Sequence, residues 1–206
     1  VPLIKYVGPQ VWASRPGRAK TLAGAVDHLL ALYGFDAPWF EREGLATTVV
    51  GSSALHIDMA GADGPAFRTR RGIAAEAKLL LVLPGSRPSE IARMTPVYEE
   101  TVRKLKAVDP TLEIAVVAAG TVAGDVAGRI AAWPFRVHLV DEAEKYDAMR
   151  AADAALATSG TVSTELALAG APMVIAYKID GLSYQLMKRM VTAKHITLFN
   201  ICLLYT

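Results

Sequence analysis

The stretch that decides the fold is LLLVLPGSRPSE, residues 79–90. An unbroken apolar run ends at Pro84-Gly85-Ser86, and Arg87 follows directly before a segment with helical spacing. The apolar run predicts a strand buried on both faces, as in a parallel sheet covered by helices. The turn after it has two interpretations at this point: an ordinary strand-to-helix loop, or an anion site.

The composition is that of a globular protein. The 206 residues are 52% hydrophobic and 20% charged, and the formal net charge is +2 with dispersed cations, so no nucleic-acid partner is expected. One cysteine, Cys202, leaves no internal disulfide and suits a reducing compartment. No apolar run reaches the roughly 18–20 residues of a membrane span. The chain begins with Val1-Pro2, and we expect it to be a piece of a longer protein, truncated at both ends.

Short β-rich runs alternate with longer helical patterns along the chain, which is typical of parallel α/β folds. Strands are expected near residues 3–7, 28–32, 47–50, 78–83, 113–118, 136–139, 154–157, 172–177 and 195–198. Helices are expected over residues 18–26, 37–43, 89–108, 122–132, 145–151, 161–169 and 182–191. Pro96 should kink the long helix or mark its true start.

A stretch rich in Gly, Ala, Ser and Asp, residues 51–65, has no sustained period and predicts a linker between two α/β units. We expect residues 1–52 to belong to an N-terminal domain, residues 53–65 to form the linker, and residues 66–200 to form a second domain. The first unit has only three predicted strands, too few for a stable doubly wound domain. Its beginning is therefore expected to lie outside this chain.

Common nucleotide and metal motifs do not occur in the sequence. Neither GxxxxGK[ST] nor GxGxxG is present. His28, His138 and His195 lie at predicted strand edges and are best interpreted as structural, so a metal site is not expected. The acidic residues Asp141, Glu142 and Glu144 could supply paired carboxylates, but a solvated helix start favoured by the macrodipole is the better interpretation.

A second small-residue turn, ATSGTVSTE at residues 157–165, follows another predicted buried strand. Ser159, Gly160 and Thr161 can cap a helix, and Glu165 follows four residues past Thr161. The turn is either a capping motif with a solvated glutamate, or an anion cradle beside a carboxylate that accepts from ribose hydroxyls. Loops after parallel strands open at one sheet edge, where open α/β folds bind ligands. The two loops together, with Arg87 as a bidentate donor, favour a nucleotide diphosphate site.

Three motifs in combination resemble the lipid-A-disaccharide synthase family. The first is LLLVLPGSRPSEI at residues 79–91, and the second is IKYVGPQVWASRPGR at residues 4–18. The third is SGTVSTELALAGAPMVIAYK at residues 159–178, which is followed by a predicted strand ending in Phe199-Asn200. The resemblance covers about residues 3–200. It implies an α/β fold of GT-B type with two Rossmann-like parallel-sheet units, the first incomplete. It also implies transfer from UDP-2,3-diacylglucosamine (UDP-diacylglucosamine) to 2,3-diacylglucosamine 1-phosphate (lipid X), giving lipid A disaccharide 1-phosphate and UDP without a metal or cofactor.

The resemblance also implies roles for single residues. Ser86 and Arg87 would hold the donor diphosphate, Ser159, Gly160 and Thr161 would form the cradle, Glu165 would contact the ribose, and Arg87 and Asn200 would be catalytic. The general base is implied to be an aspartate in the part of the N-terminal domain outside this chain. A cytoplasmic protein, peripheral on the inner face of the inner membrane, is expected. The tail ICLLYT, residues 201–206, is expected to be foreign to the family.

Two alternatives remain open on the sequence. The chain could belong to another GT-B enzyme that uses a UDP-sugar, such as the peptidoglycan transferase or a UDP-sugar epimerase. It could also bind UDP without catalysing a transfer.

Overall fold

The computed structural model describes residues 1–179, which form two units, Val1–His56 and Ile57–Ile179. Each unit contains a parallel sheet with helices packed on it, so the predicted α/β class is confirmed. The elements expected at residues 182–191 and 195–198, the candidate Asn200 and the tail at residues 201–206 lie outside the described residues.

The first unit is built on a three-stranded parallel sheet in the order β1-β2-β3. Its elements are β1 (Ile4–Tyr6), α1 (Arg18–Ala23), β2 (His28–Ala31), α2 (Ala37–Glu41), β3 (Ala46–Val49) and the 3-10 turn η1 (Ser53–His56). Burial alternates along β2 because successive side chains point to opposite faces of a strand. Leu29 and Phe40 are fully buried in the core that α1 and α2 form on one face.

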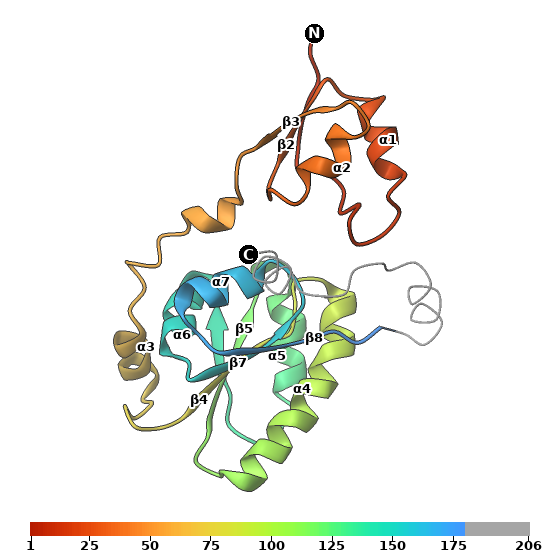
Figure 1. Ribbon diagram of the computed structural model, residues 1–206. Helices are drawn as coiled ribbons and strands as arrows, with labels where there is room; N and C mark the ends of the chain where they lie inside the picture. The colour runs from red at the N-terminus through yellow and green to blue at the C-terminus, as the bar shows by residue number, and fades with distance from the viewer. Residues whose placement is uncertain (180–206) are drawn as a thin grey trace. The chain divides into compact units, whose positions relative to one another are not determined.

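The second unit is a five-stranded parallel sheet in the order β6-β5-β4-β7-β8 (Figure 1). The strands are β4 (Leu79–Leu83), β5 (Glu113–Ala118), β6 (His138–Asp141), β7 (Ala154–Thr158) and β8 (Met173–Ala176). All five residues of β4 are buried, as expected of a central strand. The chain runs outward from β4 through β5 to β6, then crosses to the other side of β4 to form β7. The strand order therefore reverses between β4 and β7, which makes this the topological switch point of the sheet.

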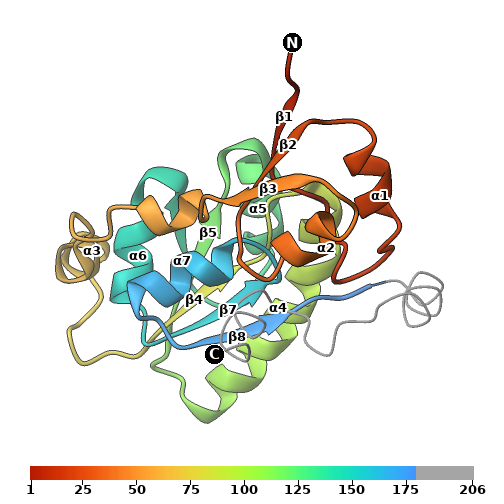
Figure 2. The same ribbon diagram turned by 45° about the horizontal axis from the view of Figure 1, so that its top comes forward.

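Helices cover both faces of this sheet, as Figures 1 and 2 show. The helix α4 (Pro88–Val108), the turn η2 (Gly120–Val122) and α5 (Ala123–Ile130) pack on the face that carries Leu80 and Val82. The helices α3 (Gly64–Arg71), α6 (Lys145–Ala151) and α7 (Val162–Ala169) pack on the opposite face, against Leu81. The turn η3 (Glu142–Glu144) joins β6 to α6. Alternate side chains of one strand thus supply two separate cores.

One helix was not expected, and one of the two interpretations of Pro96 is wrong. Residues 64–71 form α3, where the sequence predicts the last two residues of the linker and no helix. The Asp63 side chain caps this helix by accepting from the Ala66 N–H at 2.8 Å, and Gly72 ends it at φ 65°. The long helix α4 starts at Pro88 and continues through Pro96, so Pro96 is not its start. Proline suits the first helical position because its fixed φ is already helical and no N–H is needed there.

Arg68 fastens α3 to the sheet. Its guanidinium donates to the carbonyl oxygens of Ala77 and Ala151 at 2.7 Å each and to the Asp153 carboxylate at 2.9 Å. The side chain is only 14% exposed. Because these acceptors lie just before β4 and β7, one guanidinium organises the start of both central strands.

Candidate functional site

The loops that follow β4 and β7 are neighbours. The two strands pair in parallel with Leu83 opposite Ala157. Residues 84–87 therefore leave the sheet beside residues 159–161, at the same carboxyl edge and at the switch point. The expected convergence of the two small-residue loops is observed, and it brings Ser86 and Arg87 to the same edge as Ser159, Gly160 and Thr161.

The loop after β4 depends on a glycine and on a buried carboxylate. Gly85 has φ 119°, a conformation open to glycine but strained for other residues, and an added Cβ would lie 2.7 Å from Glu90 Oε2. Glu90 is 6% exposed. Its Oε2 accepts from the Ser86 N–H at 3.1 Å, and its Oε1 accepts from Arg87 Nη1 at 2.5 Å. Arg87 itself is 74% exposed. The loop thus presents a guanidinium at the surface and braces it from below.

Glu90 is a site residue that the sequence analysis did not single out. It is the third residue of α4, and Arg87 is the N-cap. A glutamate at this position reaches back to N–H groups before the helix, as in a capping box. Its negative charge also lies at the positive end of the helix dipole. The spacing of Arg87 and Glu90 in PGSRPSE is the signal that could have identified it.

The loop after β7 presents backbone donors. Within residues 1–179, the N–H groups of Gly160, Thr161 and Val162 have no acceptor. The Ser159 N–H, by contrast, donates to the Ala176 carbonyl at 3.2 Å. Gly160 and Thr161 are exposed, and Thr161 is the N-cap of α7. Successive N–H groups at the positive end of a helix form a local arrangement suited to an anion.

Glu165 lies on the first turns of α7 and is held in an ion-pair cluster. Lys145 Nζ lies 3.1 Å from Glu165 Oε2 and 2.9 Å from Glu142 Oε1. The expectation that Glu165 is solvated under the capping interpretation is wrong, because its side chain is only 14% exposed. Lys145 was not predicted as a partner of Glu165, because the two residues are 20 positions apart along the chain.

The acidic residues before α6 begin a helix, as predicted, but they are not simply solvated. Glu142 and Glu144 form the turn η3, and Glu142 pairs with Lys145. Glu144 pairs with Arg70 at 3.2 Å and also with Arg71. Ion pairs to other elements thus replace the paired-carboxylate site that was the alternative.

A buried hydrogen bond joins the two loop regions from behind. Tyr98 Oη on α4 lies 3.2 Å from Thr158 Oγ1 at the end of β7. Burial raises the pKa of Tyr98 to about 12, although the hydrogen bond with Thr158 opposes this shift. The contact fixes α4, which carries the first loop, against the strand that carries the second.

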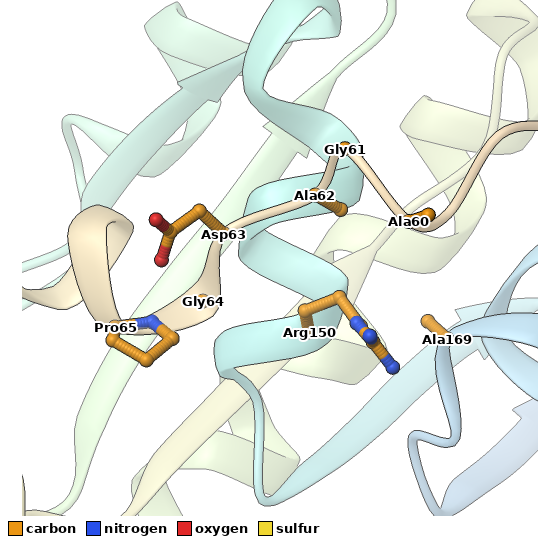
Figure 3. Close-up of a pocket in the computed structure, with 8 residues that line it drawn as sticks. All are labelled: Ala60, Gly61, Ala62, Asp63, Gly64, Pro65, Arg150 and Ala169. Carbon is orange, nitrogen blue, oxygen red and sulfur yellow. The ribbon is translucent and has the colours of Figure 1, made fainter.

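A pocket of about 430 Å³ lies elsewhere in this unit, between the segment at residues 60–65, Arg150 and Ala169. Figure 3 shows that the Asp63 carboxylate points away from the Arg150 guanidinium. Arg150 and Ala169 lie near the ends of α6 and α7, just before β7 and β8. The pocket is therefore at the amino edge of the sheet, and the switch point at the opposite edge remains the candidate site.

The histidines have structural partners where the structure describes them. His28 Nε2 lies 2.9 Å from Thr48 Oγ1, and His138 Nε2 lies 2.9 Å from Glu113 Oε2, both across neighbouring strands. The structural interpretation is confirmed for these two, and His195 lies outside the described residues. Within residues 1–179, no group of three or more His, Cys, Asp or Glu side chains could hold a metal ion. No helix in the same range is long and apolar enough to cross a membrane.

A doubly wound parallel sheet with two donor-rich loops at its switch point defines a Rossmann-like ligand-binding α/β protein. The sequence pattern of the family described as Lipid-A-disaccharide synthetase matches residues 1–205. The chain therefore belongs to the lipid-A-disaccharide synthase family, a family of glycosyltransferases in lipid A biosynthesis.

Individual relatives agree with the family assignment. The lipid-A-disaccharide synthase of Rhodospirillum centenum is 46% identical over 204 residues, which cover 98% of this chain and 51% of that protein. The enzyme of the same name from Paramagnetospirillum magneticum is 45% identical over 203 residues, covering 98% and 52%. The chain thus spans about half the length of the curated relatives it matches. A solved glycosyl transferase family 9 structure from Veillonella parvula aligns with a TM-score of 0.45 at 11% identity, over 79% of this chain and 60% of that one.

Proposed function

We propose that the chain is the donor-binding part of a glycosyltransferase that joins UDP-2,3-diacylglucosamine to lipid X, forming lipid A disaccharide 1-phosphate and UDP. Membership of the family supports the reaction class. One structural observation carries the nucleotide-binding part of the proposal. The loops that hold Arg87 and Thr161 leave adjacent parallel strands at the switch point of the sheet.

In this proposal, Arg87 and the loop after β7 stabilise the departing UDP. The glycosidic bond to the diphosphate breaks as the acceptor hydroxyl attacks, and negative charge grows on the leaving phosphate. The exposed guanidinium of Arg87 and the N–H groups of Gly160, Thr161 and Val162 would meet that charge, with no metal ion required. Donors that are already oriented act without reorganisation during the reaction, which is why such sites accelerate it.

The remaining assignments follow the family resemblance. Ser86 would contact the diphosphate through its hydroxyl, and its N–H, which is bonded to Glu90, would reach a phosphate only by displacing that carboxylate. Ser159 would complete the cradle, and Glu165 would accept hydrogen bonds from the ribose. Asn200 would lie near the reacting centre. The general base would be an aspartate outside this chain, and the acylated substrates would place the enzyme at the inner face of the inner membrane as a peripheral protein.

A second candidate function is UDP binding without sugar transfer by this chain alone. The observation behind it is that the chain spans about half of each matched relative. Transfer is therefore tested by disaccharide formation from the two lipid substrates, with the chain joined to the N-terminal segment of a relative. If the longer protein forms the disaccharide and the chain alone does not, then this chain binds UDP and sugar transfer also requires the N-terminal segment.

The nucleotide site is tested by calorimetry with UDP on wild-type chain and on Arg87→Ala. Loss of one hydrogen bond from a charged donor should weaken UDP binding roughly 10- to 100-fold, because such a bond is worth about 1.5–3 kcal/mol. Glu165→Ala should weaken it as well. Arg103→Ala is the matched control. Arg103 lies on α4, of which Arg87 is the N-cap, and like Arg87 it pairs with a nearby glutamate, Glu99, at 2.5 Å.

The control residue is far from the site. Sixteen residues of helix separate it from Arg87, and this corresponds to roughly 24 Å. UDP affinity should therefore be unchanged in Arg103→Ala. The site assignment fails if the wild-type chain binds no UDP, or if neither Arg87→Ala nor Glu165→Ala differs from the control.

A further inference from the structure

Lys145 occupies a position that helix electrostatics disfavours. It is the first residue of α6, where the helix dipole presents its positive end. Its side chain is only 14% exposed, and a lysine is rarely buried this far without a partner. A compensating interaction is needed to keep a cation there.

Glu165 supplies the more buried part of that interaction. Lys145 Nζ lies 3.1 Å from its Oε2 and 3.3 Å from its Oε1, so the ammonium faces the whole carboxylate. Glu142 also binds the ammonium at 2.9 Å, but its side chain is 50% exposed. The ring of Tyr146 covers the ammonium at 4.8 Å from its centroid. Burial alone would lower the pKa of Lys145, but Glu142 and Glu165 outweigh it and raise the pKa, so the lysine stays charged.

We propose that Lys145 is a positioning residue that fixes the Glu165 carboxylate to accept hydrogen bonds from both hydroxyls of the donor ribose. The inference rests on the proposed function, because the ribose contact of Glu165 belongs to it. A carboxylate has about four lone-pair sites, and one ammonium leaves enough of them to accept from two vicinal hydroxyls. The ammonium also ties the start of α6 to the start of α7, so the carboxylate is held relative to the loop at residues 159–161.

Removing the ammonium would change the direction of the carboxylate. Glu142 and Glu165 share one cation, so they would repel each other without it. Glu165 would then turn toward solvent and stop facing the ribose. The loss would fall on recognition of the hydroxyls rather than of the diphosphate, because the partners of the Lys145 ammonium within residues 1–179 are Glu142, Glu165 and the Tyr146 ring, and not Arg87. Lys145 therefore sets the preference for a ribonucleotide over a 2′-deoxyribonucleotide.

The test measures the affinities of the chain for UDP and for 2′-deoxyuridine diphosphate by calorimetry. Wild type should prefer UDP by tenfold or more, since a hydrogen bond to a charged acceptor is worth about one to two powers of ten in affinity. In Lys145→Met this preference should fall to about threefold or less, because UDP loses the bonds from both hydroxyls whereas 2′-deoxyuridine diphosphate loses only the bond from its 3′-hydroxyl. Lys145→Arg should restore the preference. The double variant Lys145→Met/Glu165→Ala should lose no more than Glu165→Ala alone, as expected of residues that act through one contact.

Lys104→Met is the matched control. Its ammonium pairs with Glu100 at 2.8 Å but is 75% exposed on α4, and its removal should leave the preference unchanged. A merely structural Lys145 would weaken both nucleotides alike and leave their ratio intact, which would overturn the proposal. Lys145→Gln gives the same readout if the methionine variant unfolds. Failure of wild type to bind UDP would overturn the proposed function with it. If the preference for UDP over 2′-deoxyuridine diphosphate is lost in Glu165→Ala but kept in Lys145→Met, only the proposed role of Lys145 is overturned.

Discussion

Replacing Gly85 by alanine should damage the loop after β4 in two ways. At φ 119° a residue with a Cβ is strained, at a cost of about 1–3 kcal/mol. The new Cβ would also lie 2.7 Å from Glu90 Oε2 and 2.8 Å from Glu90 Cβ, which are buried parts of a packed side chain. Moving the carboxylate would break its bonds to the Ser86 N–H and to Arg87, and leaving a buried acceptor without partners costs about 1–3 kcal/mol.

Together these two costs amount to about 2–6 kcal/mol, with the lower end applying if the loop relaxes locally. Hydrogen exchange followed by mass spectrometry on peptides from β4 gives the free energy of unfolding of the second unit separately. UDP calorimetry reads the loop itself, and binding should weaken at least about tenfold because Arg87 loses its brace.

The same substitution at Gly128 is the control and should have the opposite sign. Gly128 is exposed within α5, and an added Cβ there would meet nothing within 4 Å. Alanine should stabilise that helix by about 0.5–1 kcal/mol and leave UDP binding unchanged. The reasoning is refuted if Gly85→Ala unfolds at the wild-type free energy and binds UDP as tightly as wild type.

Two further predictions concern stability. Arg68→Met should lower the free energy of unfolding of the second unit by about 3–5 kcal/mol because it leaves buried acceptors without a donor, whereas Arg70→Met, on the same helix but 46% exposed, should change it far less. Equal effects of the two changes in hydrogen exchange at β4 would contradict this. Burial raises the pKa of Asp36 from 3.8 to about 6, although a hydrogen bond from Trp12 opposes this shift. Between these two values the folded first unit binds a proton that the unfolded chain does not, so its free energy of unfolding falls as the pH rises from about 4 to 6. Asp36→Asn keeps a hydrogen-bond acceptor, so it should remove this dependence of stability on pH and stabilise the first unit at pH 7 by an amount on the order of 1–2 kcal/mol. Hydrogen exchange at β2 measures both effects, and an unchanged pH dependence would exclude Asp36 as its source.

The central strands were predictable because their sequences are nearly pure apolar runs, and only burial on both faces allows such runs. The helix α3 was not predicted. Its polar, arginine-rich sequence follows a glycine-rich stretch, and it is held in place by Arg68 through acceptors near residues 77 and 151–153. The acceptors of Arg68 at residues 151 and 153 lie 83 and 85 residues further along the chain, and contacts over such intervals leave no local signal in the sequence.

The convergence of the two loops was predictable for a similar physical reason. Parallel strands that are neighbours must place their following loops side by side, and the small residues after each strand mark those loops. The residues that brace the site were not predicted. The bond between Lys145 and Glu165 exists only because α6 packs beside α7, and the role of Glu90 depends on the unusual backbone of Gly85.

The bond between Glu90 and the loop after β4 has a consequence for turnover. The Ser86 N–H donates to the Glu90 carboxylate, so a phosphate that takes this donor must displace an acceptor supplied by the protein. Binding is then an exchange of one anion for another, and the affinity measured is the difference between the two. When the phosphate departs, the carboxylate returns to the donor within the same molecule. In the proposed function, such an exchange would lower the barrier to losing a spent nucleotide, which is the step that limits many well-evolved enzymes.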